Sequence, residues 1–156
     1  MIEKPTAMIP VRPLGRELAI LLVEDNPDDV RLAEEVLREG NIPGQLYVAG
    51  DGEEALEYLH RRGRFTSAAR PDLILLDLKL PRLDGHGLLA EIRRDPALCR
   101  IPVVVLTSSS SARDILRAQE LRCSCYVAKP SGIDEFPDLI KTIGFWLGVA
   151  ASTASD

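Results

Sequence analysis

The chain has 156 residues, of which 46% are hydrophobic and 28% charged, and its formal net charge is −5. This length suits one domain, and we expect no second folded domain, so any output must pass through a partner. The acidic balance argues against nucleic-acid binding, which needs a basic surface to displace counterions from phosphates. No apolar run approaches the roughly 20 residues of a membrane span, so we expect no membrane segment.

The two ends of the chain differ from the part between them. Residues 1–16 contain prolines at positions 5, 10 and 13 and lack the continuous apolar stretch of a secretory signal. We therefore expect a flexible leader there and a disordered tail at residues 149–156. One domain is expected between residues 17 and 148.

Cysteines and histidines are few. Cys99, Cys123 and Cys125 are odd in number and lack the spacing of a metal clip, so we expect reduced thiols and a cytoplasmic protein. His60 and His86 are the only histidines, which disfavours a His-rich metal site or a Ser-His-Asp triad. Both are expected on helix surfaces.

Short apolar runs alternate with amphipathic segments five times, which predicts a βαβ series with a parallel sheet. The strands are expected at residues 18–23, 45–49, 72–77, 102–107 and 123–128. The helices are expected after Asn26, after Asp51, around Leu88 to Ile92, before Leu121 and from Phe136 to Leu147. The predicted fold class is α/β, a flavodoxin-like doubly wound (βα)5 arrangement with the parallel sheet order 2-1-3-4-5.

Capping residues mark the starts of the first two helices. Asn26 is a candidate N-cap, Pro27 suits the first helical position, and residues 28–29 place two aspartates at the positive end of the helix. Asp51 and Glu54 have the spacing of a capping box. These signals strengthen the predicted boundaries between strands and helices.

Polar side chains follow four of the predicted strands at their carboxyl ends, where functional residues of open α/β sheets gather. They are Glu24 and Asp25 after the first strand, Asp77 after the third, Thr107 after the fourth and Lys129 after the fifth. Each alone is explained by helix capping, strand propensity or a loop start. Their occurrence together, in order and each at a strand end, predicts a site in which three carboxylates converge.

Three crowded carboxylates repel one another, and Mg²⁺ relieves this repulsion best because it prefers oxygen ligands and keeps positions for water and phosphate. The metal would screen Asp77 from an incoming phosphoryl group, so that this aspartate can act as a nucleophile. Lys129 would neutralise further charge, and Thr107 could donate a hydrogen bond to a phosphoryl oxygen.

These residues match a known family, because the chain resembles the receiver domain of two-component response regulators over residues 17–148. The matching segments are residues 21–26, 71–81, 84–85, 102–107 and 126–130. The resemblance implies a stand-alone response regulator that accepts a phosphoryl group from a histidine kinase onto Asp77. Such a protein is a signalling switch, which catalyses only its own phosphorylation and dephosphorylation.

The resemblance also implies how the metal is held. Glu24 and Asp25 are the acidic pair that serves Mg²⁺. Asp77 is both the phosphoacceptor and a ligand, and the backbone carbonyl of Lys79 completes the protein's share of the coordination.

A second implication concerns the switch. The Thr107 hydroxyl moves toward the phosphoryl group, Tyr126 changes rotamer with it, and Lys129 pairs with the acyl phosphate. A Lys129–Pro130 bond in cis would aim the lysine inward. The face formed by the fourth helix, fifth strand and fifth helix then signals to a partner.

A narrower resemblance is to single-domain regulators paired with bacterial phytochrome kinases. The supporting features are residues 24–27, the long basic loop at residues 61–70, and the end of the last helix at residues 145–147. It implies a bacteriophytochrome as the cognate kinase, a downstream protein or phosphotransfer protein as reader, and a homodimer through the face described above. Trp146 either anchors that face or packs on its own sheet. We interpret the basic loop as a solvated connection rather than a partner site.

Two positions flank the expected phosphoryl group in unusual ways. Lys79 lies two residues after Asp77, and Ser109 lies two residues after Thr107. We hypothesise that the extra cation at Lys79 changes the lifetime of the phosphoryl group.

Other functions fit the sequence less well. A receiver-like docking or phosphate-sink module that acts independently of phosphorylation is the main alternative, although the complete site disfavours it. A hydrolase with an aspartate nucleophile would need an Asp-x-Asp-x-Thr motif, but Asp77 is followed by Leu78 and Lys79. A nucleotide-binding flavodoxin-like protein would need a Gly-rich phosphate loop, which the sequence lacks.

Overall fold

The structure, a computed structural model, describes residues 18–108 and 111–154. Its strands form one parallel sheet in the order β2-β1-β3-β4-β5, which confirms the predicted fold. The strands are β1 (Ala19–Val23), β2 (Gln45–Ala49), β3 (Leu73–Leu76), β4 (Val103–Thr107) and β5 (Cys125–Ala128). The helices are α1 (Pro27–Glu39), α2 (Gly52–Leu59), α3 (Gly85–Arg94), α4 (Ala112–Glu120) and α5 (Phe136–Ala154). The leader expected at residues 1–16 lies outside the described residues.

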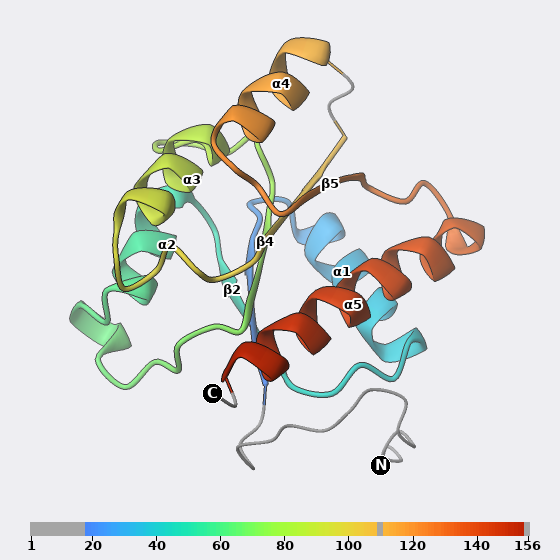
Figure 1. Ribbon diagram of the computed structural model, residues 1–156. Coiled ribbons are helices and arrows are strands. Elements are labelled where there is room, and N and C mark those ends of the chain that lie inside the picture. The colour runs from blue at the N-terminus through green and yellow to red at the C-terminus, as the bar shows by residue number, and fades with distance from the viewer. Residues whose placement is uncertain (1–17, 109–110, 155–156) are drawn as a thin grey trace.

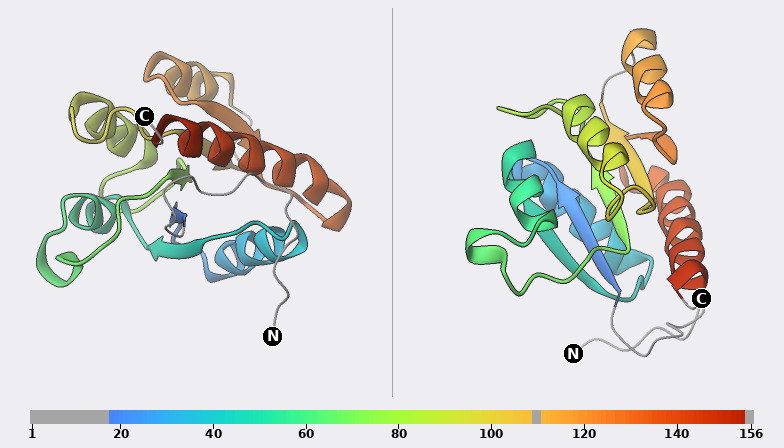
Figure 2. Two further views of the ribbon diagram at one scale, coloured as in Figure 1. Left: turned by 60° about the horizontal axis from the view of Figure 1, so that its bottom comes forward. Right: turned by 60° about the vertical axis from the view of Figure 1, so that its left-hand side comes forward.

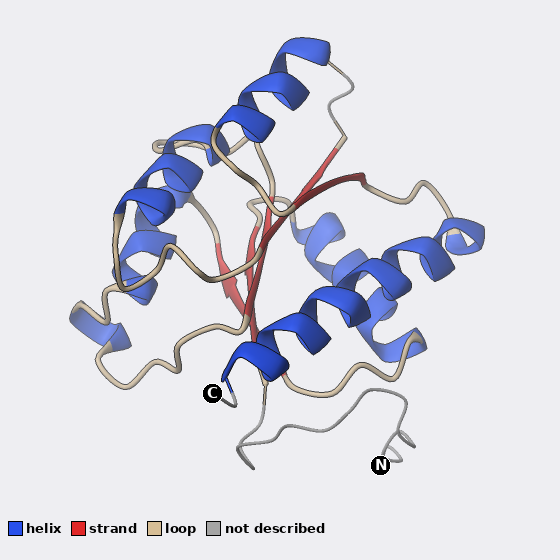
Figure 3. Cartoon of the chain, viewed as in Figure 1, coloured by secondary structure: helices blue, strands red, loops and turns tan. Residues whose placement is uncertain are grey.

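Helices cover both faces of the sheet (Figure 1). α1 and α5 lie on one face, and α2, α3 and α4 lie on the other. Figure 2 shows these layers from two further directions, and Figure 3 shows the strands enclosed between the helices. Because both faces are covered, β1, β3 and β4 are buried along their whole length.

Successive side chains of a strand point to opposite faces, so the central strands supply two separate apolar clusters. In β1, Leu21 and Val23 belong to the cluster under α2, α3 and α4. Ile20 and Leu22 belong to the cluster under α1 and α5. The edge strand β2 has a neighbour on one side only and leaves Val48 exposed. The near-continuous apolar run of β1 is therefore explained by burial on both sides.

The predicted caps are present at the starts of α1 and α2. The Asn26 Oδ1 accepts a hydrogen bond of 2.8 Å from the Asp28 N–H. The Asp51 Oδ1 accepts one of 2.8 Å from the Glu54 N–H, and the Glu54 Oε1 accepts one of 2.7 Å from the Gly50 N–H. In a standard capping box the Glu54 side chain would accept from the N–H of the cap residue Asp51, but here it accepts from the preceding Gly50. This hydrogen bond ties the β2–α2 connection to the helix.

His86 is more buried than the sequence suggests, and the basic loop, although mostly exposed as predicted, contacts the core through Phe65. His86 was expected on a helix surface, but it is buried because the first turn of α3 lies beside α4, where its Nε2 is 3.2 Å from the Asp114 carbonyl oxygen. The basic loop at residues 61–70 contains a short 3-10 helix, Gly63–Phe65. The Phe65 ring packs edge-on against Tyr58, with 5.4 Å between the ring centroids, so the loop is anchored to the core.

Two backbone expectations are corrected. The Lys129–Pro130 bond is trans, because the described residues contain no cis peptide bond. α5 continues to Ala154, into the stretch expected to be a disordered tail at 149–156, since residues 149–154 contain neither glycine nor proline to stop a helix. In the part of the chain that the structure describes, no helix has both the length and the apolar character needed to cross a membrane.

Candidate functional site

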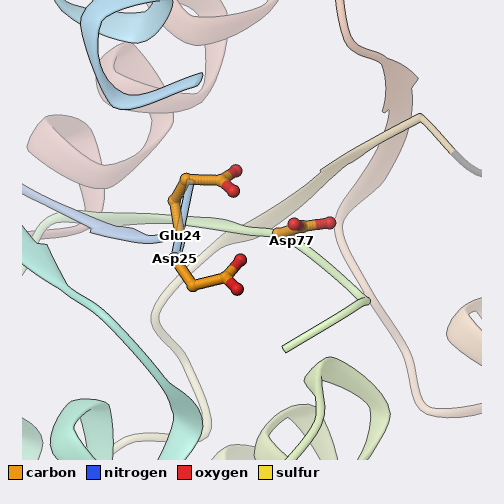
Figure 4. A group of neighbouring side chains, drawn as sticks. All are labelled: Glu24, Asp25 and Asp77. Atoms are coloured by element: carbon orange, nitrogen blue, oxygen red, sulfur yellow. The ribbon is translucent and has the colours of Figure 1, made fainter. Parts of the chain in front are cut away.

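Three carboxylates converge at the carboxyl edge of the sheet. Glu24 and Asp25 follow β1 and Asp77 follows β3 (Figure 4). These strands are parallel neighbours in which Val23 pairs with Leu76, so their ends are level. One carboxylate oxygen from each acid lies within 4.8 Å of the other two, and the group can hold a metal ion. The sequence prediction that these three residues meet is therefore confirmed.

The backbone of the site fixes two of the carboxylates. The Asp77 N–H donates to the Val23 carbonyl oxygen at 3.1 Å, and the Asp77 Oδ1 accepts from the Lys79 N–H at 3.3 Å. The Glu24 Oε2 accepts from the Asn26 N–H at 3.2 Å. Glu24 and Asp77 are only 4% and 5% exposed, whereas Asp25 is exposed. The site therefore contains two buried carboxylates that accept backbone hydrogen bonds and one carboxylate that is accessible to solvent.

Gly85, at the start of α3, packs against the backbone that carries Asp77. Its N–H donates to the Leu78 carbonyl oxygen at 3.0 Å. A Cβ at this position would lie 2.5 Å from the Leu78 Cα and still closer to the Asp77 carbonyl oxygen. Only glycine permits this approach. Gly85 therefore determines where the β3–α3 connection holds the phosphoacceptor candidate.

Lys129 reaches into the carboxylate group from the end of β5. Its Nζ lies 2.9 Å from the Glu24 Oε1, 2.7 Å from the Asp29 Oδ2 and 3.4 Å from the Asp77 Oδ2. The side chain is 11% exposed, and the Lys129 N–H donates to the Thr107 carbonyl oxygen at 3.1 Å. The trans peptide bond after Lys129 thus still allows the lysine to reach the acids.

Asp29 is a member of this charge network that the sequence reasoning missed. From the sequence, its carboxylate is explained only as a favourable charge at the start of α1. It lies 100 residues before Lys129 in the chain, yet the two side chains form a hydrogen bond of 2.7 Å. Its position in the first turn of α1, directly after the strand end that carries Glu24 and Asp25, is the signal that the sequence offers.

The electrostatics of the site favour a bound cation. Burial by itself lowers the pKa of Lys129, but hydrogen bonds to Asp29 and Glu24 and the charge of Asp77 outweigh burial and raise it, so the ammonium is retained. Burial raises the pKa of Glu24, and the nearby charge of Asp77 raises it further, against the opposing contacts of Lys129. The Lys129 ammonium contacts three carboxylates, and Asp25 adds a fourth beside Glu24 and Asp77.

A metal such as Mg²⁺ fits this donor set. The ligands would be oxygens, two of the three acids accept hydrogen bonds from the backbone, and the exposed Asp25 leaves a side open to water or phosphate. A divalent cation would also offset the surplus negative charge. The residues that would hold it are Glu24, Asp25 and Asp77.

An open groove of about 470 Å³ adjoins the carboxylates. Asp25 and Lys79 line its side nearest the sheet, and His86 and Asp114 line the side formed by α3 and α4. Lys79 is exposed and lines this groove together with Asp25. The groove gives a small donor molecule or water a path to this edge.

The two predicted switch residues lie on β4 and β5. Thr107 is fully buried at the end of β4, the strand between those that precede Asp77 and Lys129. Tyr126 in β5 is half-buried against the cluster under α2, α3 and α4. Val105 of β4 pairs with Tyr126. Ser109 lies outside the described residues.

Comparison with known proteins agrees with this arrangement. Residues 20–141 match the response regulator receiver domain. Response regulator Rcp1 of Synechocystis sp. is 43% identical over 129 residues, which cover 82% of this chain and 88% of Rcp1. The Mn²⁺-bound structure of Rcp1 has a TM-score of 0.76, with coverage of 83% of this chain and 94% of that one.

Two further solved structures are similar. The phosphorylated cyanobacterial phytochrome response regulator RcpA is 44% identical, with a TM-score of 0.79 and coverage of 86% of this chain and 96% of that one. The bacteriophytochrome response regulator RtBRR is 39% identical, with a TM-score of 0.73 and coverage of 84% and 78%. Because a relative well above 30% identity spans most of both chains, this protein belongs to the response-regulator receiver family.

Proposed function

We propose that this chain is a stand-alone response regulator that takes a phosphoryl group from a partner histidine kinase onto Asp77. The observation that carries the proposal is the Asp77 carboxylate itself. It is buried, lies within metal-binding distance of Glu24 and Asp25, and has the Lys129 ammonium at 3.4 Å. This set can bind a cation, accept a phosphoryl group and neutralise its charge.

In the proposed reaction, an Asp77 Oδ attacks the phosphorus atom while the bond from phosphorus to the kinase histidine nitrogen breaks. Glu24, Asp25, Asp77 and the Lys79 backbone carbonyl would hold Mg²⁺, which supplies charge neutralisation and orients the phosphoryl oxygens. Lys129 then donates to the acyl phosphate. The Thr107 hydroxyl donates to a phosphoryl oxygen and draws β4 toward the site.

The output of the proposed switch is a change of population on the face formed by α4, β5 and α5. Phosphorylation favours one arrangement of Thr107 and Tyr126, and a partner reads the adjacent surface. A downstream protein or a phosphotransfer protein is the proposed reader. The names of RcpA and RtBRR as phytochrome response regulators support a phytochrome kinase as the cognate donor. The cytoplasm is the proposed location.

A second copy of this chain is the proposed occupant of the same face. Phe145 of α5 and Leu116 of α4 are 61% and 58% exposed, so two large apolar side chains of this face are available to a second copy. Trp146 packs on its own sheet, with its ring 5.1 Å from Phe145. Phe145 rather than Trp146 is therefore the aromatic residue available to anchor a dimer.

Incubation with acetyl phosphate and Mg²⁺, followed by the mass of the intact protein, tests the proposed function. We expect one added phosphoryl group, which does not form when the metal is chelated before the donor is added or when Asp77 is replaced in Asp77→Asn. The same samples, measured by light scattering before and after phosphorylation, report the dimer; a monomer in both states contradicts it. If neither acetyl phosphate nor a kinase adds a phosphoryl group, the phosphorylation-independent docking module replaces this proposal.

Lys79→Asn is expected to raise the rate of dephosphorylation by more than twofold. The exposed Lys79 side chain lines the groove beside Asp25, where its cation pairs with phosphoryl oxygens and its length obstructs the approach of water. The rate is measured as the loss of phosphorylated protein after removal of the donor. Lys141→Asn, on the exposed surface of α5, is the matched control. A rate within twofold of the wild type in Lys79→Asn would show that the cation has no such role.

A further inference from the structure

Lys129 lies closer to Asp29 than to the phosphoacceptor candidate. Its Nζ is 2.7 Å from the Asp29 Oδ2 but 3.4 Å from the Asp77 Oδ2. Asp29 comes from α1 and lies outside the group of three carboxylates that can hold a metal ion. Its interaction with Lys129 therefore needs an explanation that the proposed metal site does not supply.

The hydrogen-bond donors of the Lys129 ammonium are all directed to carboxylates. It carries three N–H groups, and three carboxylates, those of Glu24, Asp29 and Asp77, lie within 3.4 Å of it. A new hydrogen bond to a phosphoryl oxygen therefore requires that one of these acids release the ammonium. Asp29 holds it most closely and has no other part in the proposed reaction.

Asp29 is also held in place by the start of α1. The Asp29 N–H donates to the Asn26 carbonyl oxygen at 3.0 Å, and Pro27 restricts the backbone of the first turn. The helix therefore keeps Asp29 from following the ammonium toward a phosphoryl group. When the lysine shifts, the pair must lengthen and weaken.

We propose that Asp29 competes with the phosphoryl group for the Lys129 ammonium and thereby disfavours the phosphorylated state. The inference rests on the proposed function, because it concerns the same site. The charge of Asp29 acts in the same direction, since it repels the anionic phosphoryl group. Asp29 is thus a positioning residue that sets how strongly Lys129 can bind the phosphorylated aspartate.

The neighbouring residue supplies a matched control. Asp28 occupies the same first turn of α1 and carries the same charge, but its carboxylate is exposed and pairs with Arg31. Asp28→Asn and Asp29→Asn therefore remove equal charge from the same helix end. Only the second removes the contact with Lys129.

Titration with beryllofluoride, an analogue of the aspartyl phosphoryl group, at saturating Mg²⁺ measures the competition at equilibrium. We expect Asp29→Asn to bind it more than twofold more tightly than the wild type, and Asp28→Asn to differ by less than twofold. An affinity of Asp29→Asn that is weaker or within twofold of the wild type overturns the inference. A weaker affinity would mean that Asp29 presents the lysine to the phosphoryl group instead of withholding it.

If the wild type binds no beryllofluoride, the proposed function fails and the inference with it; equal binding by wild type and Asp29→Asn refutes the inference alone.

Discussion

Replacement of Lys129 by methionine is expected to lower the free energy of unfolding by about 3 to 5 kcal/mol at neutral pH, the usual cost of removing one partner from a buried ion pair. Methionine retains much of the aliphatic volume, so little of the loss comes from a cavity. The loss arises because Glu24, Asp29 and Asp77 then repel one another without the ammonium that lies within 3.4 Å of all three.

The pH dependence of this variant separates charge repulsion from lost packing. Burial already raises the pKa of Glu24 in the wild type, and removal of the lysine raises it further. A carboxyl group whose pKa is raised on folding contributes stability at low pH, which is lost as the pH rises through the folded-state pKa. The difference in stability between Lys129→Met and the wild type is therefore greatest near neutrality and shrinks as the pH falls toward 4.5, the ordinary value for glutamate.

Chemical denaturation at several pH values measures both effects. Added Mg²⁺ is expected to restore more stability to Lys129→Met than to the wild type, since the metal offsets the same repulsion. Lys141→Met on the exposed surface of α5 is the control and should change stability by less than about 0.5 kcal/mol. A loss of stability in Lys129→Met that is independent of both pH and Mg²⁺ would contradict the electrostatic explanation.

Gly85→Ala is the second substitution with a large expected effect. The added Cβ would lie 2.5 Å from the Leu78 Cα, and backbone atoms cannot yield as a flexible side chain does. We expect a loss of about 3 kcal/mol in the free energy of unfolding, at the upper end of overpacking costs. The displaced β3–α3 connection carries Asp77, so phosphorylation by acetyl phosphate should slow by roughly 100-fold, as expected for a reacting group misplaced by about 1 Å.

Gly148→Ala tests whether this effect belongs to the site or to any helical glycine. A Cβ on Gly148, in α5, would meet nothing within 4 Å. This substitution should raise stability by about 0.5 to 1 kcal/mol, because alanine loses less backbone entropy in a helix. Equal stability and equal phosphorylation rates in the two variants would refute the proposed close approach at Gly85.

The fold and most of the site were predictable because they depend on the spacing of apolar and capping residues along the chain. β2 (Gln45–Ala49) has the predicted bounds, and β1 and β4 differ from theirs by one residue at the start. Asn26 and Asp51 cap the predicted helices. The convergence of the carboxylates could be inferred from the parallel order of the strands, because parallel strands place their carboxyl ends at one edge of the sheet.

Asp77 illustrates the division between sequence and tertiary structure. The amino-acid sequence is enough to predict that this acid follows a buried strand and has acidic partners at the end of a neighbouring strand, because strand periodicity and parallel order are local and topological properties. The packing of Gly85 against the Asp77 backbone and the contact of Asp29 with Lys129 are visible only in the folded protein. Contacts between residues as far apart in the chain as Asp29 and Lys129 depend on how helices and strand ends pack together. The spacing of residues within one segment does not predict such packing.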